Sequence, residues 1–215
     1  MGELTETRRA EPAAREAGAG GAKRAQILAG AGRVFLAHGF AAASMGEIAR
    51  AAGVSKGTLY VYFESKTALF HSLIEEQKRN TAEKLAEFDP SDRDVAAVLT
   101  SFAIRLIGEL TDPAHVALMR VVIGAAEVFP ELGRTFYESG PAFGARRLAA
   151  YLAALTKEGV LTIDDPDAAA WRFLGMCNTP SLTAAIMGLP RPDAAEIARQ
   201  AKGVVQTFMK ASAPG

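Results

Sequence analysis

The chain has 215 residues, of which 49% are hydrophobic and 22% are charged, and its 24 lysines and arginines are balanced by 24 aspartates and glutamates. This composition is typical of a folded globular protein and excludes a disordered chain. A single cysteine, Cys177, excludes an internal disulfide and a zinc site built on cysteines. Abundant alanine and few β-branched runs favour helix throughout, so the sequence predicts an all-α fold.

Two stretches bear on secretion and membranes. Residues 1–21 carry charges of both signs and no apolar run, unlike a signal peptide. The longest uncharged stretch, 173–190, has polar residues and a proline at 178–181, near its middle, where a membrane span tolerates them least. We therefore expect a cytoplasmic protein without membrane association.

The first four predicted helices follow an N-terminal tail. The tail, 1–21, has no apolar period, and we expect it to be weakly ordered. Apolar residues at helical spacing predict a helix over 23–39. Serines at N-cap positions begin the next three helices, which we expect at 44–53, 55–62 and 65–88.

Six more helices are predicted after an Asp-Pro break, at 95–110, 112–129, 130–140, 141–159, 165–188 and 193–208. The segment 116–129 contains only two charged residues, so we expect its helix to be central and buried. Pro180 cannot donate a backbone hydrogen bond, which predicts a kink in the helix that carries it. We divide the chain into the tail 1–21, a domain at 22–68 and a second domain at 69–215.

Residues 44–63 carry the most informative motif. Two short helices meet at Gly53, which can adopt the positive φ that a tight turn between helices requires. Ala49 is small where the second helix must cross closely, and Leu59 faces inward. This spacing is typical of a helix-turn-helix, whose second helix enters the DNA major groove. An ordinary helical corner is the alternative.

The second helix of this motif presents side chains suited to DNA. They can hydrogen bond to phosphates and base edges. Lys66 adds a positive charge at the start of the next helix, where the helix dipole also favours a phosphate. The candidate contacts from this pattern are Ser55, Lys56, Gly57, Thr58, Tyr60, Tyr62 and Lys66.

Residues 23–74 resemble the DNA-binding domain of the TetR family of transcriptional regulators. The resemblance is carried by FLAHGF at the end of the first helix and continues through SMGEIARAAGVSKGTLYVYFESKTALF. The remainder resembles the AefR-like C-terminal domain of that family, through 120–141, 147–155 and 163–175.

This resemblance implies a homodimer whose helix-turn-helix units read an inverted repeat in double-stranded DNA. It also implies a C-terminal domain that binds a small molecule and dimerises. By family position, phosphate would be contacted by Ser44, Tyr62 and Lys66, and the groove by Lys56, Thr58 and Tyr60. Gly46 stands where some members place a long side chain that reads a base, which puts a base contact from that position in doubt.

Several residues of the second domain are candidates for an effector pocket. Arg120 and Glu127 project from one face of an apolar helix, about 10 Å apart, so each must meet another helix, a cavity or a ligand. Trp171 and Asn178 lie on the helix expected to kink, and could line a cavity. Structural ion pairs and core or dimer contacts are the alternatives. The candidate pocket residues are Phe102, Arg120, Val121, Glu127, Phe143, Trp171 and Asn178.

We expect the long apolar helices 142–158 and 166–188 to form the dimer seam. Cys177 is expected in the core rather than as an oxidation sensor. No catalytic constellation and no metal-ligand spacing emerges, so we expect no enzyme activity, cofactor or metal. Together these features predict a ligand-responsive repressor with an unidentified small-molecule effector, lipophilic compounds being among the candidates. An activator, or a helical sensor that does not bind DNA, is the alternative.

Overall fold

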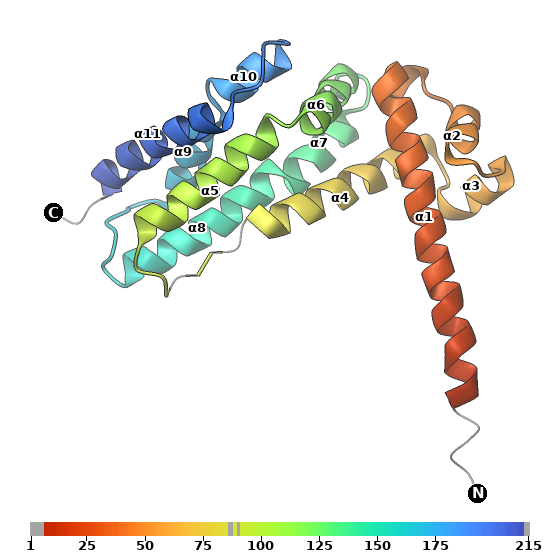
Figure 1. Cartoon of the computed structure of the whole chain (residues 1–215), viewed down its shortest axis with the longest axis horizontal. Coiled ribbons are helices and arrows are strands. Elements are labelled where there is room, and N and C mark those ends of the chain that lie inside the picture. The colour runs from red at the N-terminus through yellow and green to blue at the C-terminus, as the bar shows by residue number, and fades with distance from the viewer. Residues whose placement is uncertain (1–6, 86–87, 90, 213–215) are drawn as a thin grey trace, which may run out of the picture. The chain divides into compact units, whose positions relative to one another are not determined.

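The computed structural model describes residues 7–85, 88–89 and 91–212, with side chains for all of these but 7–19 and 77–84 (Figure 1). The elements within these ranges are helices, α1 to α11, which confirms the all-α prediction. They form two compact units that divide between Leu73 and Ile74. None of the described helices is long and apolar enough to cross a membrane.

The first unit contains α1 (Thr7–Ala42), α2 (Met45–Ala52), α3 (Lys56–Tyr62) and the start of α4 (Lys66–Leu85). Residues 1–6 of the expected tail lie outside the described residues. From Thr7 onward the structure differs from the expectation, because α1 runs through this stretch as helix. Its alanines, glutamates and arginines all have high helix propensity. The regular helix is interrupted at Gly39, with φ 74°, as the sequence predicts.

Aromatic side chains and one close helix crossing hold this unit together. The rings of Phe35, Phe40 and Phe70 form a cluster, with centroids 4.8 to 5.7 Å apart. On α1, Gly30 lies so close to α2 that a Cβ there would be 2.6 Å from the Cα of Ala52. Only glycine fits this crossing without displacing backbone, so Gly30 sets the approach of α1 and α2.

The second unit is built around four helices. Its buried apolar cluster draws on α5 (Val95–Leu110), α8 (Pro141–Lys157), α9 (Pro166–Asn178) and α11 (Ala194–Ser212), which lie side by side in Figure 1. Each presents apolar side chains at helical spacing on the face that packs inward. The unit also contains the part of α4 from Ile74 onward, α6 (Pro113–Ala126), α7 (Pro130–Ser139) and α10 (Ser181–Ile186).

Two predictions for this unit are wrong. The segment 116–129 is not central, because α6 lies outside the main cluster, with Ile123 58% exposed, and Val128, which follows α6, is 72% exposed. The helix expected over 165–188 is not one kinked helix, because α9 ends at Asn178 and α10 begins at Ser181. Pro180 removes a backbone donor and its ring clashes with the preceding turn, and here the result is a break.

Candidate DNA-binding surface and ligand cavity

The turn between α2 and α3 is fixed by hydrogen bonds at both ends of α2. Ser44 and Glu47 form the predicted capping box, with Glu47 N donating to Ser44 Oγ (3.3 Å) and Ser44 N donating to Glu47 Oε2 (3.0 Å). Hydrogen bonds from the Ser44 hydroxyl and backbone N–H lower the pKa of the Glu47 carboxyl. Gly53 adopts φ 65° and ends the helix, as predicted.

Side chains of α1 also hold the end of α2. Gln26 Nε2 donates to the carbonyl of Ala52 at 2.7 Å, and the Arg33 guanidinium donates to the carbonyl of Ala51. These carbonyls have no partner within α2 itself, because they belong to its last turn. The helix-turn-helix therefore rests on α1 through polar contacts as well as through the Gly30 crossing.

The solvent face of α3 and its N-cap contain six of the predicted contacts and one further exposed residue. Leu59 is fully buried, whereas Ser55, Lys56, Gly57 and Tyr60 are exposed and Thr58 and Tyr62 are half-buried. Ser55 Oγ accepts from Thr58 N at 3.0 Å and so caps the helix. Val61, for which the sequence reasoning predicted no role, is 82% exposed. It lies about 200° around the helix from Leu59, so it points away from the core.

Lys56 lies against the start of α2. A Cβ built on Gly46 would be 3.0 Å from Lys56 Cε and 3.3 Å from Lys56 Nζ. The lysine stem therefore occupies the space that a side chain at position 46 would need. Gly46 has no side chain, and Lys56 from the next helix places its positive charge beside position 46.

Lys66 makes two hydrogen bonds within the protein. Its Nζ donates to the carbonyls of Ala41 (3.0 Å) and Ala43 (2.8 Å), and lies 4.7 Å from the centroid of the Phe40 ring. Burial lowers the pKa of this lysine. An ammonium group has three N–H donors, so one remains for a phosphate after these two hydrogen bonds. Lys66 thus connects the start of α4 to the end of α1 and the residue that follows it.

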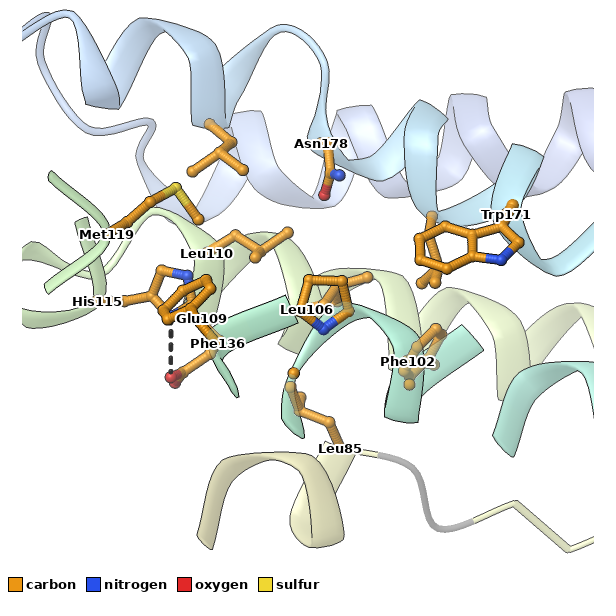
Figure 2. A pocket seen from close by; sticks show the side chains of 15 residues that line it. Leu85, Phe102, Leu106, Glu109, Leu110, His115, Met119, Phe136, Trp171 and Asn178 are labelled. Atoms are coloured by element: carbon orange, nitrogen blue, oxygen red, sulfur yellow. Dashed lines mark ion pairs between the residues drawn. The ribbon is translucent and has the colours of Figure 1, made fainter. Parts of the chain in front are cut away.

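The second unit contains a cavity of about 150 Å³. Figure 2 shows that its walls are mostly apolar side chains, with Phe102, Leu106 and Leu110 coming from α5. The lining residues are Leu85, Phe102, Leu106, Glu109, Leu110, His115, Met119, Phe136, Gly140, Pro141, Gly144, Trp171, Leu174, Asn178 and Leu182.

The cavity brings together three of the seven residues predicted for an effector pocket. Phe102, Trp171 and Asn178 line it, but Arg120, Val121, Glu127 and Phe143 do not. Arg120 instead donates to the carbonyls of Ile186 (Nε, 3.0 Å) and Ala185 (Nη2, 2.9 Å), at the end of α10. Glu127 follows the last turn of α6 and is exposed. Arg120 therefore contacts a neighbouring helix, but through backbone carbonyls rather than through the structural ion pair considered as the alternative.

Two polar residues of the cavity were missed. Glu109 is in the last turn of α5 and His115 in the first turn of α6, and His115 Nδ1 lies 3.7 Å from Glu109 Oε1. The imidazole is nearly buried and packs edge-on against Phe136, with ring centroids 6.1 Å apart. The sequence signal was weak because the two residues are six apart. They meet because α5 ends and α6 begins on either side of the turn at Thr111 and Asp112.

Trp171 is well placed as a reporter of this cavity. It is the only tryptophan in the chain, and its ring stacks on Tyr137 with centroids 5.9 Å apart and planes inclined by 5°. Both rings are about half exposed. Ligand that enters the cavity contacts this indole directly.

Cys177 behaves as a core residue. It is fully buried, and burial raises the pKa of its thiol to about 12. A thiol that stays protonated is a poor nucleophile, which argues against an oxidation sensor. Within the part of the chain that the structure describes, no group of His, Cys, Asp and Glu residues could hold a metal ion.

A short N-capped helix, a glycine turn and a second helix with an exposed polar face define a helix-turn-helix DNA-binding protein with a separate helical domain. Residues 27–73 match the tetR family of bacterial regulatory proteins, and residues 97–213 match the C-terminal domain of AefR-like transcriptional repressors. The chain belongs to the TetR family.

Individual proteins show the same relationship. The chain is 32% identical to the transcriptional regulator AcrR of Shigella flexneri over 111 residues, 51% of this chain and 52% of AcrR. It is 43% identical to the transcriptional activator FasR of Mycolicibacterium smegmatis over 58 residues, 27% of this chain and 26% of FasR. The chain thus spans about half the length of these curated relatives or less. The structure of the Flavonoid-responsive Regulator FrrA superposes with a TM-score of 0.78 at 35% identity, covering 90% of this chain and 98% of FrrA.

Proposed function

We propose that the protein is a ligand-responsive transcriptional regulator that binds an inverted-repeat operator through α2 and α3. The observation that carries this is the exposed polar face of α3, presented by a helix-turn-helix whose two helices are both capped. A protein of this kind acts where its DNA is, which for a bacterial regulator is the cytoplasm.

The DNA contacts follow from the position of each side chain on α2, α3 and α4. The proposed phosphate contacts are Ser44, Tyr62 and Lys66. Ser55, Lys56, Gly57, Thr58 and Tyr60 are proposed to face the groove. Val61 joins this set, because an exposed β-branched side chain on a recognition helix can contact a thymine methyl group.

Operator selection followed by binding measurements tests this assignment. An operator is first selected from random double-stranded DNA, and affinity is then measured by fluorescence anisotropy at several salt concentrations. Tyr60→Ala and Lys56→Ala should change the preferred bases, whereas Lys66→Ala, at a proposed phosphate contact, should lower the dependence of log K on log salt by about 0.9 for each phosphate that the lysine neutralises. Lys202→Ala, an exposed lysine on α11, is the matched control. Equal operator affinity for the wild type and a folded Tyr60→Ala, Lys56→Ala double variant contradicts the assignment.

We also propose a homodimer that forms through α8 and α9. Two recognition helices must lie roughly 34–36 Å apart to enter successive major grooves on one side of DNA, and a two-fold dimer provides this. A monomeric mass at micromolar concentration, measured by sedimentation or light scattering, contradicts the dimer.

The cavity of the second unit is the proposed effector site, and its mostly apolar, ring-lined wall supports a lipophilic aromatic effector. The similarity to a regulator named as flavonoid-responsive is consistent with this class. For the effector to weaken operator binding a hundredfold, it must favour the other conformation by about 2.7 kcal/mol, and DNA must weaken effector binding by the same factor. Identical effector affinities with and without operator DNA rule out release of the DNA through such a conformational change.

Repression is favoured over activation by the match of the C-terminal domain to AefR-like repressors. The resemblance to the activator FasR, which covers 27% of this chain, keeps activation as the second candidate. A reporter gene placed behind the selected operator distinguishes the two by its expression with and without the regulator.

A further inference from the structure

The cavity is not uniformly apolar, and its polar groups are unevenly placed. Figure 2 shows Glu109 and His115 together at one end, and Trp171 toward the other. The side chain of His115 is 7% exposed and that of Glu109 34%, so the imidazole is nearly buried while the carboxylate keeps some contact with water. Polar groups placed in this way orient a ligand, whereas the apolar wall provides most of its affinity.

We propose that the Glu109–His115 pair selects a neutral aromatic ligand that carries a hydroxyl group, which it binds at that end of the cavity. This inference rests on the proposed effector site and specifies its ligand. A carboxylate accepts hydrogen bonds only, while an imidazole can donate or accept. A phenolic hydroxyl does both, so it can donate to Glu109 while it accepts from His115.

The local structure holds this pair in place before any ligand binds. Thr111 is buried, and its hydroxyl donates to the carbonyl of Ile107 at 2.7 Å. Asp112 caps α6, its carboxylate accepting from Ala114 N at 2.9 Å. The turn between α5 and α6 is therefore fixed on both sides, so little ordering is required when a ligand binds.

The size and polarity of the cavity favour a neutral ring. A dry cavity of about 150 Å³ is known to accept benzene, and this cavity has the same volume. A charged ligand would lose its hydration on entry. An anion would also be repelled by Glu109, and a cation would meet a carboxylate that already faces His115.

Four single-ring probes that differ at one position test the proposal. They are 4-ethylphenol, its methyl ether 4-ethylanisole, the anion 4-ethylbenzoate and the cation 4-ethylbenzylamine. Binding to the full-length protein is followed by the fluorescence of Trp171, excited at the red edge of tryptophan absorption, and checked by calorimetry. We expect 4-ethylphenol to bind about tenfold more tightly than its ether, as a hydrogen bond to a charged group implies, and both ions to bind more weakly.

Substitutions of Glu109 then identify the source of that preference. In Glu109→Leu the ratio of phenol to ether affinity should fall to about one, and in Glu109→Gln, which keeps an acceptor, it should be intermediate. Glu138→Leu, at an exposed glutamate of α7 outside the cavity, should keep the full ratio.

Three outcomes overturn the proposal. They are equal binding of phenol and ether by the wild type, tightest binding of the amine, and no binding of any probe. None of them affects the operator measurements, so failure of this inference is distinguishable from failure of the proposed regulator function.

Discussion

Replacing Lys66 by methionine separates two roles for one side chain. The substitution keeps the apolar stem but removes both hydrogen bonds to the carbonyls of Ala41 and Ala43 and the interaction with the Phe40 ring. Hydrogen bonds from a charged donor contribute about 1.5–3 kcal/mol each, and an exposed cation–π interaction about 0.5–1 kcal/mol. Lys66 is only half-buried, so hydrogen bonds to water compensate for part of the lost interaction energy. We expect the free energy of unfolding to fall by about 1–2 kcal/mol.

The second expected effect concerns DNA. If the remaining N–H of Lys66 contacts a phosphate, the slope of log K against log salt should fall by about 0.9 for each subunit. Urea unfolding, followed by circular dichroism, measures the first effect, and operator titrations at several salt concentrations measure the second. Lys202→Met is the control for both. Unchanged stability refutes a stabilising role of the Lys66 contacts between α4 and the end of α1. An unchanged salt slope refutes the phosphate contact.

Three further substitutions or treatments test the fold. Gly30→Ala should destabilise the protein by about 1–3 kcal/mol in urea unfolding, because the new Cβ would meet the backbone of Ala52. Gly21→Ala is the control: a Cβ there meets no atom within 4 Å, so this substitution should be neutral or stabilising. Arg120→Met should cost about 1–2 kcal/mol by the same measurement, since it removes two hydrogen bonds to the end of α10. Cys177 should resist iodoacetamide at pH 8 until the protein is unfolded. Burial raises the pKa of its thiol to about 12, so the contribution of the neutral thiol to the free energy of unfolding should decline as pH rises from about 9 toward 12.

The helix-turn-helix could be predicted closely because its signals are local. Ser44 with Glu47, and Gly53 nine residues after Ser44, fix the ends of α2 by contacts within a few residues. Val61 was overlooked for a different reason. Val61 is apolar and so falls outside the polar pattern on α3, although the helical angle from Leu59 alone places it on the outward face.

The second unit was less predictable because its site depends on tertiary packing. An apolar stretch such as 116–129 can lie at the centre or the edge of a bundle, and only the neighbours of α6 decide which. Arg120 gives no sequence signal for its partner, since the carbonyls that it binds are 65 and 66 residues away. Glu109 and His115 likewise become a pair only when a turn brings the ends of two helices together.

The position of α4 in the chain links the two proposed sites. It is the one described helix with residues in both compact units, Lys66 to Leu73 in the first and Ile74 to Leu85 in the second. Its first residue donates to carbonyls at and just after the end of α1, and its last residue lines the cavity. A ligand that displaces Leu85 therefore acts on the same helix that Lys66 anchors beside the helix-turn-helix. If a ligand at Leu85 changes operator affinity, linkage requires operator DNA to change ligand affinity by the same factor.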